Sequence, residues 1–100
     1  MTVYSAQKTM DPTIQNLNNI DIDLEPPYEV VLYNDDVTDI VSVIGALMVV
    51  CHHPLEVAKQ IAIEAHNEGR SIAFFGSKSE CLQVKSKLQT LGLTVECEPI

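Results

Sequence analysis

Basic residues are scarce in this sequence of 100 residues. Six lysines and arginines stand against 14 aspartates and glutamates, which gives a formal net charge of −8 at pH 7. A protein that binds nucleic acid needs lysine and arginine to release the counterions of the phosphate backbone, and anionic membrane surfaces also attract basic segments. The composition therefore argues against nucleic-acid partners and against binding to an anionic membrane.

Cysteine and long apolar runs are also limited. The three cysteines, Cys51, Cys81 and Cys97, form no C-x-x-C pair, which argues against a disulfide framework and a structural zinc site. The longest apolar run, residues 43–51, falls well short of the roughly 20 residues of a membrane-spanning helix. The first residues have no apolar signal-peptide core, and the segment up to Pro26 is acidic. We expect a cytoplasmic protein without metal or cofactor, or a plastid stromal one only if a transit peptide has been removed.

The length leaves room for one small domain. Residues 1–26 are polar, lack hydrophobic periodicity and end at Pro26-Pro27, so we expect a disordered or extended tail there and a core domain over residues 27–100. A core of this size buries only roughly 60 to 65% of its unfolded surface, which argues against a large internal active site. Function should therefore reside on the surface.

Strand-like and helix-like patterns alternate along the core. Aromatic and β-branched residues predict a strand over 28–33, and 71–75 and 93–98 also read as strands. Helices are expected from about 39 to 50 with Thr38 as N-cap, from His53-Pro54 to Gly69, and from a capping box at Ser77 and Glu80 to Gly92. The order β-α-α-β-α-β favours an α+β fold, in which a three-stranded antiparallel sheet packs against three helices.

The most polar cluster, Asn34-Asp35-Asp36, lies between the first strand and the first helix. Such residues are typical of a solvated turn near a helix N-terminus. Their oxygens could also accept the hydrogen bonds of an ammonium group. A calcium site is less well supported, because the alternating carboxylates of a calcium loop are missing. Both the turn and the cation site remain open at this stage.

Histidines allow two interpretations as well. His66 lies at the edge of an apolar helical stripe that contains Ala62 and Ala65, so it is either a packed side chain or, when neutral, a hydrogen-bond acceptor at the rim of a groove. Cys51-His52-His53 is interpreted as a turn between helices, since consecutive residues do not share a helical face. No Ser-His-Asp order, Gly-rich phosphate loop or acid pair predicts catalysis, so we do not expect an enzyme.

Two segments together resemble the ClpS family of adaptors, which deliver N-degron substrates to the Clp AAA+ protease. These segments are Tyr28-Glu29-Val30-Val31-Leu32-Tyr33-Asn34-Asp35-Asp36-x-Thr38 and Ala65-His66-x-x-Gly69-Arg70-Ser71-Ile72. The similarity extends over about residues 27–98, and the predicted element order agrees with the fold of that family.

The resemblance implies that the protein recognises a free N-terminus with a bulky hydrophobic first residue. It places Asn34, Asp35 and His66 at the α-amino group. The pocket for the first side chain would be formed by Asp36, Thr38, Ile40, Val43, Ala62, Ala65 and Leu93. The implied partners are N-degron substrates and the N-terminal domain of a ClpC- or ClpA-type ATPase, which works with the peptidase ClpP.

Four positions depart from the residues common in that family. Ile40 and Ala62 stand where members often have Met, Ala65 where they have Val, and Asp39 where they have Pro. Two alanines widen a pocket floor, and a β-branched Ile40 is stiffer than Met. A divergent paralogue of the cyanobacterial or plastid type, with shifted specificity, is one interpretation. The chief alternative is an interaction domain that binds the ATPase but has altered or lost N-terminal recognition.

Overall fold

The computed structural model describes residues 26–100. The elements follow the order β2 (Tyr28–Tyr33), α2 (Ile40–Cys51), α3 (Leu55–Glu68), β3 (Arg70–Gly76), α4 (Lys78–Thr90) and β4 (Thr94–Pro99). This is the predicted β-α-α-β-α-β order, and element boundaries differ from the predicted ones by only one or two residues. The predicted tail over 1–26 lies, except for Pro26, outside the described residues.

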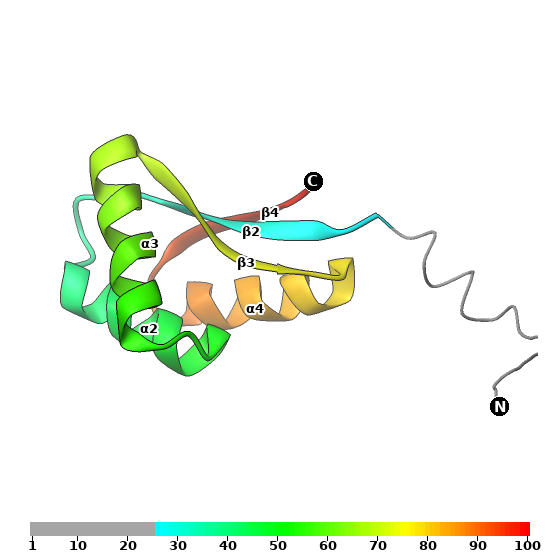
Figure 1. Ribbon diagram of the computed structural model, residues 1–100, viewed down its shortest axis with the longest axis horizontal. Coiled ribbons are helices and arrows are strands. Elements are labelled where there is room, and N and C mark those ends of the chain that lie inside the picture. The colour runs from blue at the N-terminus through cyan, green and yellow to red at the C-terminus, as the bar shows by residue number, and fades with distance from the viewer. Residues whose placement is uncertain (1–25) are drawn as a thin grey trace, which may run out of the picture.

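The sheet is antiparallel, with β2 between β3 and β4. Val30 pairs with Phe74 on one side and with Cys97 on the other, and the register against β3 shifts by one residue after Val30. All three helices cover the same face of the sheet (Figure 1). The predicted α+β fold is therefore confirmed.

The core lies between this face and the helices. Because side chains alternate along a strand, Val30 and Leu32 of β2 both point toward the helices and are buried. The helices contribute residues at helical spacing: Ala46, Leu47 and Cys51 from α2, Ala58, Ile61 and Ala65 from α3, and Cys81, Val84 and Leu88 from α4. Two layers packed in this way hold the ends of β2, α2 and α3 in fixed relative positions.

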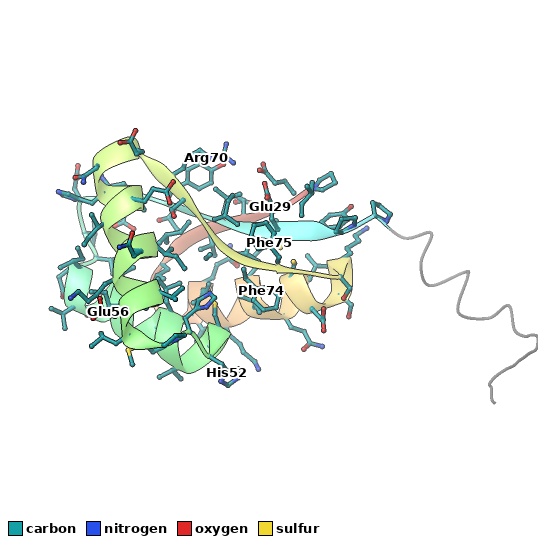
Figure 2. All side chains as sticks on the ribbon, viewed as in Figure 1. Glu29, His52, Glu56, Arg70, Phe74 and Phe75 are labelled. Atoms are coloured by element: carbon teal, nitrogen blue, oxygen red, sulfur yellow. The ribbon has the colours of Figure 1, made fainter. Side chains whose placement is uncertain are left out.

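The opposite face of the sheet carries polar pairs. Arg70 and Glu29 point away from the helices (Figure 2), and the Arg70 guanidinium donates to Glu98 at 2.8 Å. A hydrogen bond between the carboxyl groups of Glu29 and Glu98 raises the pKa of Glu29. Because β2 lies between β3 and β4, the Arg70–Glu98 ion pair connects the two outer strands across it, while the directly opposite carboxyl groups of Glu29 and Glu98 repel each other when both are ionised.

The helix caps agree with the sequence in two cases and differ in one. Ser77 and Glu80 form the predicted capping box, and Gly69, with φ 93°, ends α3. The prediction that Thr38 caps α2 is wrong, because the N-cap is Asp39, whose carboxylate accepts from the Ser42 N–H at 2.8 Å. The Thr38 hydroxyl is directed instead to the Gly92 carbonyl oxygen and to Asp35.

The segment Cys51-His52-His53 was predicted to be a turn between helices; Cys51 is the last residue of α2, and His52 and His53 form the connection to α3. His52 takes a left-handed conformation after α2, and His53 Nε2 lies 2.6 Å from the carbonyl oxygen of Ala73. Burial raises the pKa of the Cys51 thiol to about 11, which is typical of a small apolar residue and unlike a nucleophile. Within residues 26–100, no group of three or more His, Cys, Asp or Glu is placed to hold a metal ion. Nor does any helix in this range combine the length and apolar character needed to cross a membrane.

Candidate functional site

A pocket of about 400 Å³ opens where the β2–α2 loop meets the first turn of α2 and the last turns of α3. Every residue that the sequence analysis assigned to the site lines it: Asn34, Asp35, Asp36, Thr38, Ile40, Val43, Ala62, Ala65, His66 and Leu93. Leu32, Tyr33 and Asp39 line it as well and were not predicted. Tyr33 directly precedes Asn34, and Asp39 directly precedes Ile40, so adjacency in the sequence was the available signal.

A backbone hydrogen bond connects the loop after β2 to the end of α3 at the site. The Asn34 N–H donates to the Gly69 carbonyl oxygen at 3.0 Å, and the Gly69 N–H donates to Ala65 at 2.9 Å. Gly69 adopts a φ of 93°, which glycine accommodates without the strain that a side chain would add. The loop after β2 is therefore fixed beside the end of α3 (Figure 1), and Asn34 and His66 come to the same rim of the pocket.

Asp35 organises the loop through its carboxylate. Oδ1 accepts from the N–H groups of Val37 at 2.9 Å and Thr38 at 2.7 Å, while Oδ2 accepts from the Thr94 hydroxyl at 3.0 Å and the Thr38 hydroxyl at 3.4 Å. The hydrogen bond from the Thr38 N–H is the main cause of a lowered Asp35 pKa, and the Val37 N–H adds to it. The Thr38 hydroxyl has a single hydrogen and also lies 3.1 Å from the Gly92 carbonyl oxygen, so three donors are committed to the carboxylate: the N–H groups of Val37 and Thr38 and the Thr94 hydroxyl. They take most of the acceptor positions of the carboxylate. Asp35 thus contributes its negative charge to the site more than free lone pairs.

Thr38 fastens the loop to the other side of the pocket. Its hydroxyl lies 3.1 Å from the Gly92 carbonyl oxygen, just before Leu93 and β4. Together with the contact from Thr94 to Asp35, this holds the loop against the start of β4. The sequence did not reveal these contacts, because they join residues more than 50 positions apart.

The remaining polar side chains at the rim are accessible. Asn34, Asp36 and His66 are exposed, and no other residue in the range 26–100 forms a hydrogen bond with their side chains. The side-chain oxygens of Asn34 and Asp36 are acceptors, and a neutral imidazole provides one further acceptor nitrogen. The rim therefore offers unpaired acceptor atoms to a ligand.

The floor of the pocket is apolar and made largely of small side chains. Ala62 and Ala65 are buried in α3, and Leu93 is buried before β4. Val43 of α2 is half-buried, and Ile40 is 43% exposed at the mouth. Because alanine fills little volume, two alanines on the α3 side leave room for a sizeable apolar group.

The aspartates that line the pocket give the site a negative charge. Asp35, Asp36 and Asp39 line the pocket, and the described residues around it include no lysine or arginine. Carboxylates gathered at the mouth of a cavity attract cations and repel anions. A cationic ligand with an apolar body fits both the rim and the floor.

The role of Asp35 in the loop leads to a pH-dependent prediction. A carboxylate with a lowered folded-state pKa contributes stability above its unfolded pKa of about 3.9, and this contribution is lost as the pH falls through the folded value. We expect Asp35→Ala to lower the free energy of unfolding by roughly 1–2 kcal/mol at pH 7, and by less near pH 3.

Urea unfolding at the two pH values measures this difference. Asp36→Ala is the matched control, because it removes the adjacent carboxylate, which is exposed. An equal loss of stability for Asp35→Ala at both pH values would contradict the assigned role of its ionised form.

Comparison with known proteins identifies the family. The family model described as "ATP-dependent Clp protease adaptor protein ClpS" matches residues 23–96. The chain belongs to the ClpS family. ClpS proteins are non-catalytic adaptors that interact with Clp ATPases and their substrates, in agreement with the resemblance found in the sequence.

Individual ClpS proteins show how far the similarity extends. The ClpS adapter of Campylobacter jejuni is 34% identical over 77 residues, which is 77% of this chain and 80% of that protein. The ClpS adapter of Leptothrix cholodnii is 43% identical over 51 residues, which is 49% of this chain but only 44% of that protein. Agrobacterium tumefaciens ClpS2, solved bound to L-phenylalaninamide, superposes with a TM-score of 0.73 over 75% of this chain and 98% of its own, at 22% sequence identity. At that identity the superposition establishes the shared fold.

Proposed function

We propose that this ClpS-family protein binds polypeptides whose free N-terminus begins with a bulky hydrophobic residue, an N-degron. It then delivers them to a ClpC- or ClpA-type ATPase for degradation by ClpP. The observation that supports this most strongly is the pocket, in which an acceptor-rich acidic rim borders an apolar floor. An N-terminal residue has the matching parts, since its ammonium group and its side chain are separated by a single carbon atom.

The rim suits the ammonium group. An ammonium has three N–H donors, and the Asn34 carbonyl oxygen and a neutral His66 nitrogen supply two acceptors. Asp35 and Asp36 add negative charge, which strengthens hydrogen bonds from a cation. Asp35 also fixes the loop that presents Asn34, so we assign it a positioning role and an electrostatic role.

The floor suits the first side chain. A volume of about 400 Å³ lies within the range of small-molecule pockets. Ala62, Ala65, Val43 and Leu93 provide apolar contacts without filling the space. The ligand of the Agrobacterium ClpS2 structure, L-phenylalaninamide, combines a free amine with an aromatic side chain. A ligand of this kind is what we propose for the present pocket.

Binding to peptides that differ only at the first residue tests the proposal. Fluorescence anisotropy with Phe, Tyr, Trp, Leu, Ser and Asp peptides should show binding of some or all of the first four and none of the last two. Acetylated copies of the binding peptides serve as controls, because acetylation removes the positive charge and the ammonium donors. Binding that survives acetylation would contradict recognition of the N-terminus.

A second candidate is an interaction domain that binds the ATPase but has lost or altered N-terminal recognition. The Asp35 carboxylate favours it, because the N–H groups of Val37 and Thr38 and the Thr94 hydroxyl take most of its acceptor positions and leave few for an ammonium. Such a domain would bind the N-terminal domain of the ATPase and leave all the peptides of the panel unbound. The cytoplasmic location expected from the sequence stays a prediction for both candidates.

A further inference from the structure

The outward surface of α4 contains a shallow groove. It has a volume of about 520 Å³ and is lined by residues at helical spacing, Lys78, Ser79, Leu82, Gln83 and Ser86. We call these five residues the α4 groove. Leu82 is 46% exposed in the middle of it. Ser79 and Ser86 lie one turn before and one turn after Leu82, so their small side chains leave space on both sides of an apolar floor.

The helix that carries the α4 groove is basic, although the protein is acidic. It contains three lysines and one glutamate, a net charge of +2, whereas the whole chain carries −8. The glutamate, Glu80, is engaged in the capping box. Among residues 26–100, no acidic residue forms an ion pair with Lys78 or Lys87. The α4 groove therefore attracts a chain segment that combines apolar and acidic side chains.

The other outward surfaces of the described residues lack this combination. No residue of α2 carries a charge. The helix-free face of the sheet presents Glu29 and Glu98 (Figure 2 labels Glu29), which repel an acidic segment. On α3, Lys59 is already paired with Glu56 at 3.7 Å.

A segment of the matching chemistry directly precedes the described core. It is Ile20-Asp21-Ile22-Asp23-Leu24-Glu25. Although residues 1–26 as a whole lack hydrophobic periodicity, apolar and acidic residues alternate strictly over these six positions. In an extended conformation the three apolar side chains share one side and the three carboxylates share the other. The segment thus has an apolar side for the floor of the groove and a charge opposite to that of α4.

The chain enters the described core beside the start of α4. Tyr28 begins β2 and pairs with Gly76, and the next residue, Ser77, caps α4. The Lys78 ammonium lies 5.9 Å from the centre of the Tyr28 ring. The starts of β2 and α4 accordingly lie at the same end of the molecule (Figure 1).

Residues 20–25 are long enough to run along the α4 groove. Leu24 is four residues before Tyr28, and an extended chain covers about 13 Å over that stretch at about 3.3 Å per residue. Leu82 lies only about 6 Å along the helix from Lys78, at a rise of about 1.5 Å per residue. No rearrangement of the described core is needed for the segment to reach Leu82.

We propose that residues 20–25 bind in the α4 groove of the same chain, with Ile22 and Leu24 against Leu82. The carboxylates then lie on the solvent side of the segment, where they attract Lys78 over a Debye length of about 8 Å at physiological ionic strength. The short connection to β2 gives the segment a millimolar effective concentration, so a weak contact is sufficient. The contact is autoinhibitory for this surface, because any other acidic and apolar chain has to displace residues 20–25 before it binds there.

Limited proteolysis of the full chain tests this proposal. With a protease that cleaves beside aliphatic residues, cleavage beside Ile22 and Leu24 is measured relative to cleavage beside Ile14, which lies outside the segment. Cleavage follows the population of the open form, so we expect Leu82→Ser to raise the relative rate about five- to tenfold. Leu55→Ser is the matched control, because it changes an α3 residue that is 48% exposed, and it should leave the rate unchanged.

Amide chemical shifts of the full chain locate the contact. Ile22→Ser together with Leu24→Ser should move the signals of Leu82 and Gln83, and Leu82→Ser should move the signals of residues 20–25. Leu17→Ser changes an apolar residue outside the segment and should leave the signals of α4 in place. These shifts should be independent of protein concentration, because the contact is within one chain.

Several results would overturn the proposal. Equal relative cleavage in the native chain and in Leu82→Ser would do so, as would signals of α4 that do not respond to Ile22→Ser and Leu24→Ser. Protection that disappears on dilution would assign the α4 groove to a second copy of the chain and would also overturn it. Neither measurement uses a ligand of the pocket, so the outcome is independent of N-terminal recognition.

Discussion

Replacing Asn34 and His66 together by alanine is expected to lower the affinity for a peptide with a free hydrophobic N-terminus by at least about 100-fold. Each substitution removes an uncharged acceptor from the rim, and a hydrogen bond from a charged donor contributes roughly 1.5–3 kcal/mol. Neither substitution changes the charge of the aspartates, so the loss reports on hydrogen bonds rather than on long-range attraction. Each single variant should lose less than the double variant.

Asn67→Ala provides the control for this pair. Asn67 is exposed on α3 next to His66 and does not line the pocket, so its removal should leave the affinity unchanged. Thermal unfolding of the variants checks that the fold is retained, which is expected because Asn34 and His66 are exposed. Full affinity in the double variant would refute their assignment to the α-amino group.

Ala62→Met is expected to change which first residues bind. Ala62 is buried on the floor of a pocket of about 400 Å³, and methionine adds three heavy atoms there. Overpacking of this kind typically costs about 1–3 kcal/mol. We expect Trp and Phe peptides to lose about 10- to 100-fold in affinity, while a Leu peptide, which needs less space, loses less than about threefold.

A substitution at the next residue, Ile63, is the control for Ala62→Met. Ile63→Met changes an exposed residue of α3 that is not part of the pocket lining, and it should leave the order of peptide affinities unaltered. A uniform loss for all peptides in Ala62→Met, with an unchanged melting temperature, would contradict the placement of the first side chain against Ala62.

Local signals in the sequence were enough to predict the fold. Ser77 with Glu80 marked the start of α4, and Gly69 marked the end of α3, because both features act within a few residues. The error at the start of α2 has a similar origin. Thr38 and Asp39 are both able to cap a helix, and the sequence does not reveal that the Thr38 hydroxyl is directed to Gly92, more than 50 positions away.

Predicting the site residues required the resemblance to the ClpS family in addition to local signals. The periodicity of apolar residues placed His66 at the edge of the helical stripe that contains Ala62 and Ala65. No local feature of the sequence indicates that His66 lies near Asn34. The structure joins them through the hydrogen bond from Asn34 to Gly69. The bonds from Thr94 to Asp35 and from Thr38 to Gly92 are long-range in the same way. Asp35, which was expected to face the ligand, therefore also holds the loop in place.

Calorimetric titration of the full chain with one peptide, free and N-acetylated, tests the central claim most directly. The peptide is the tightest binder of the first-residue panel, and the two forms differ only at the α-amino group. We predict one-to-one binding of the free form and a loss of at least about 100-fold on acetylation, since the charge and the donors that face Asn34, Asp35, Asp36 and His66 are removed. Equal affinity for the two forms would contradict recognition of a free N-terminus by this pocket.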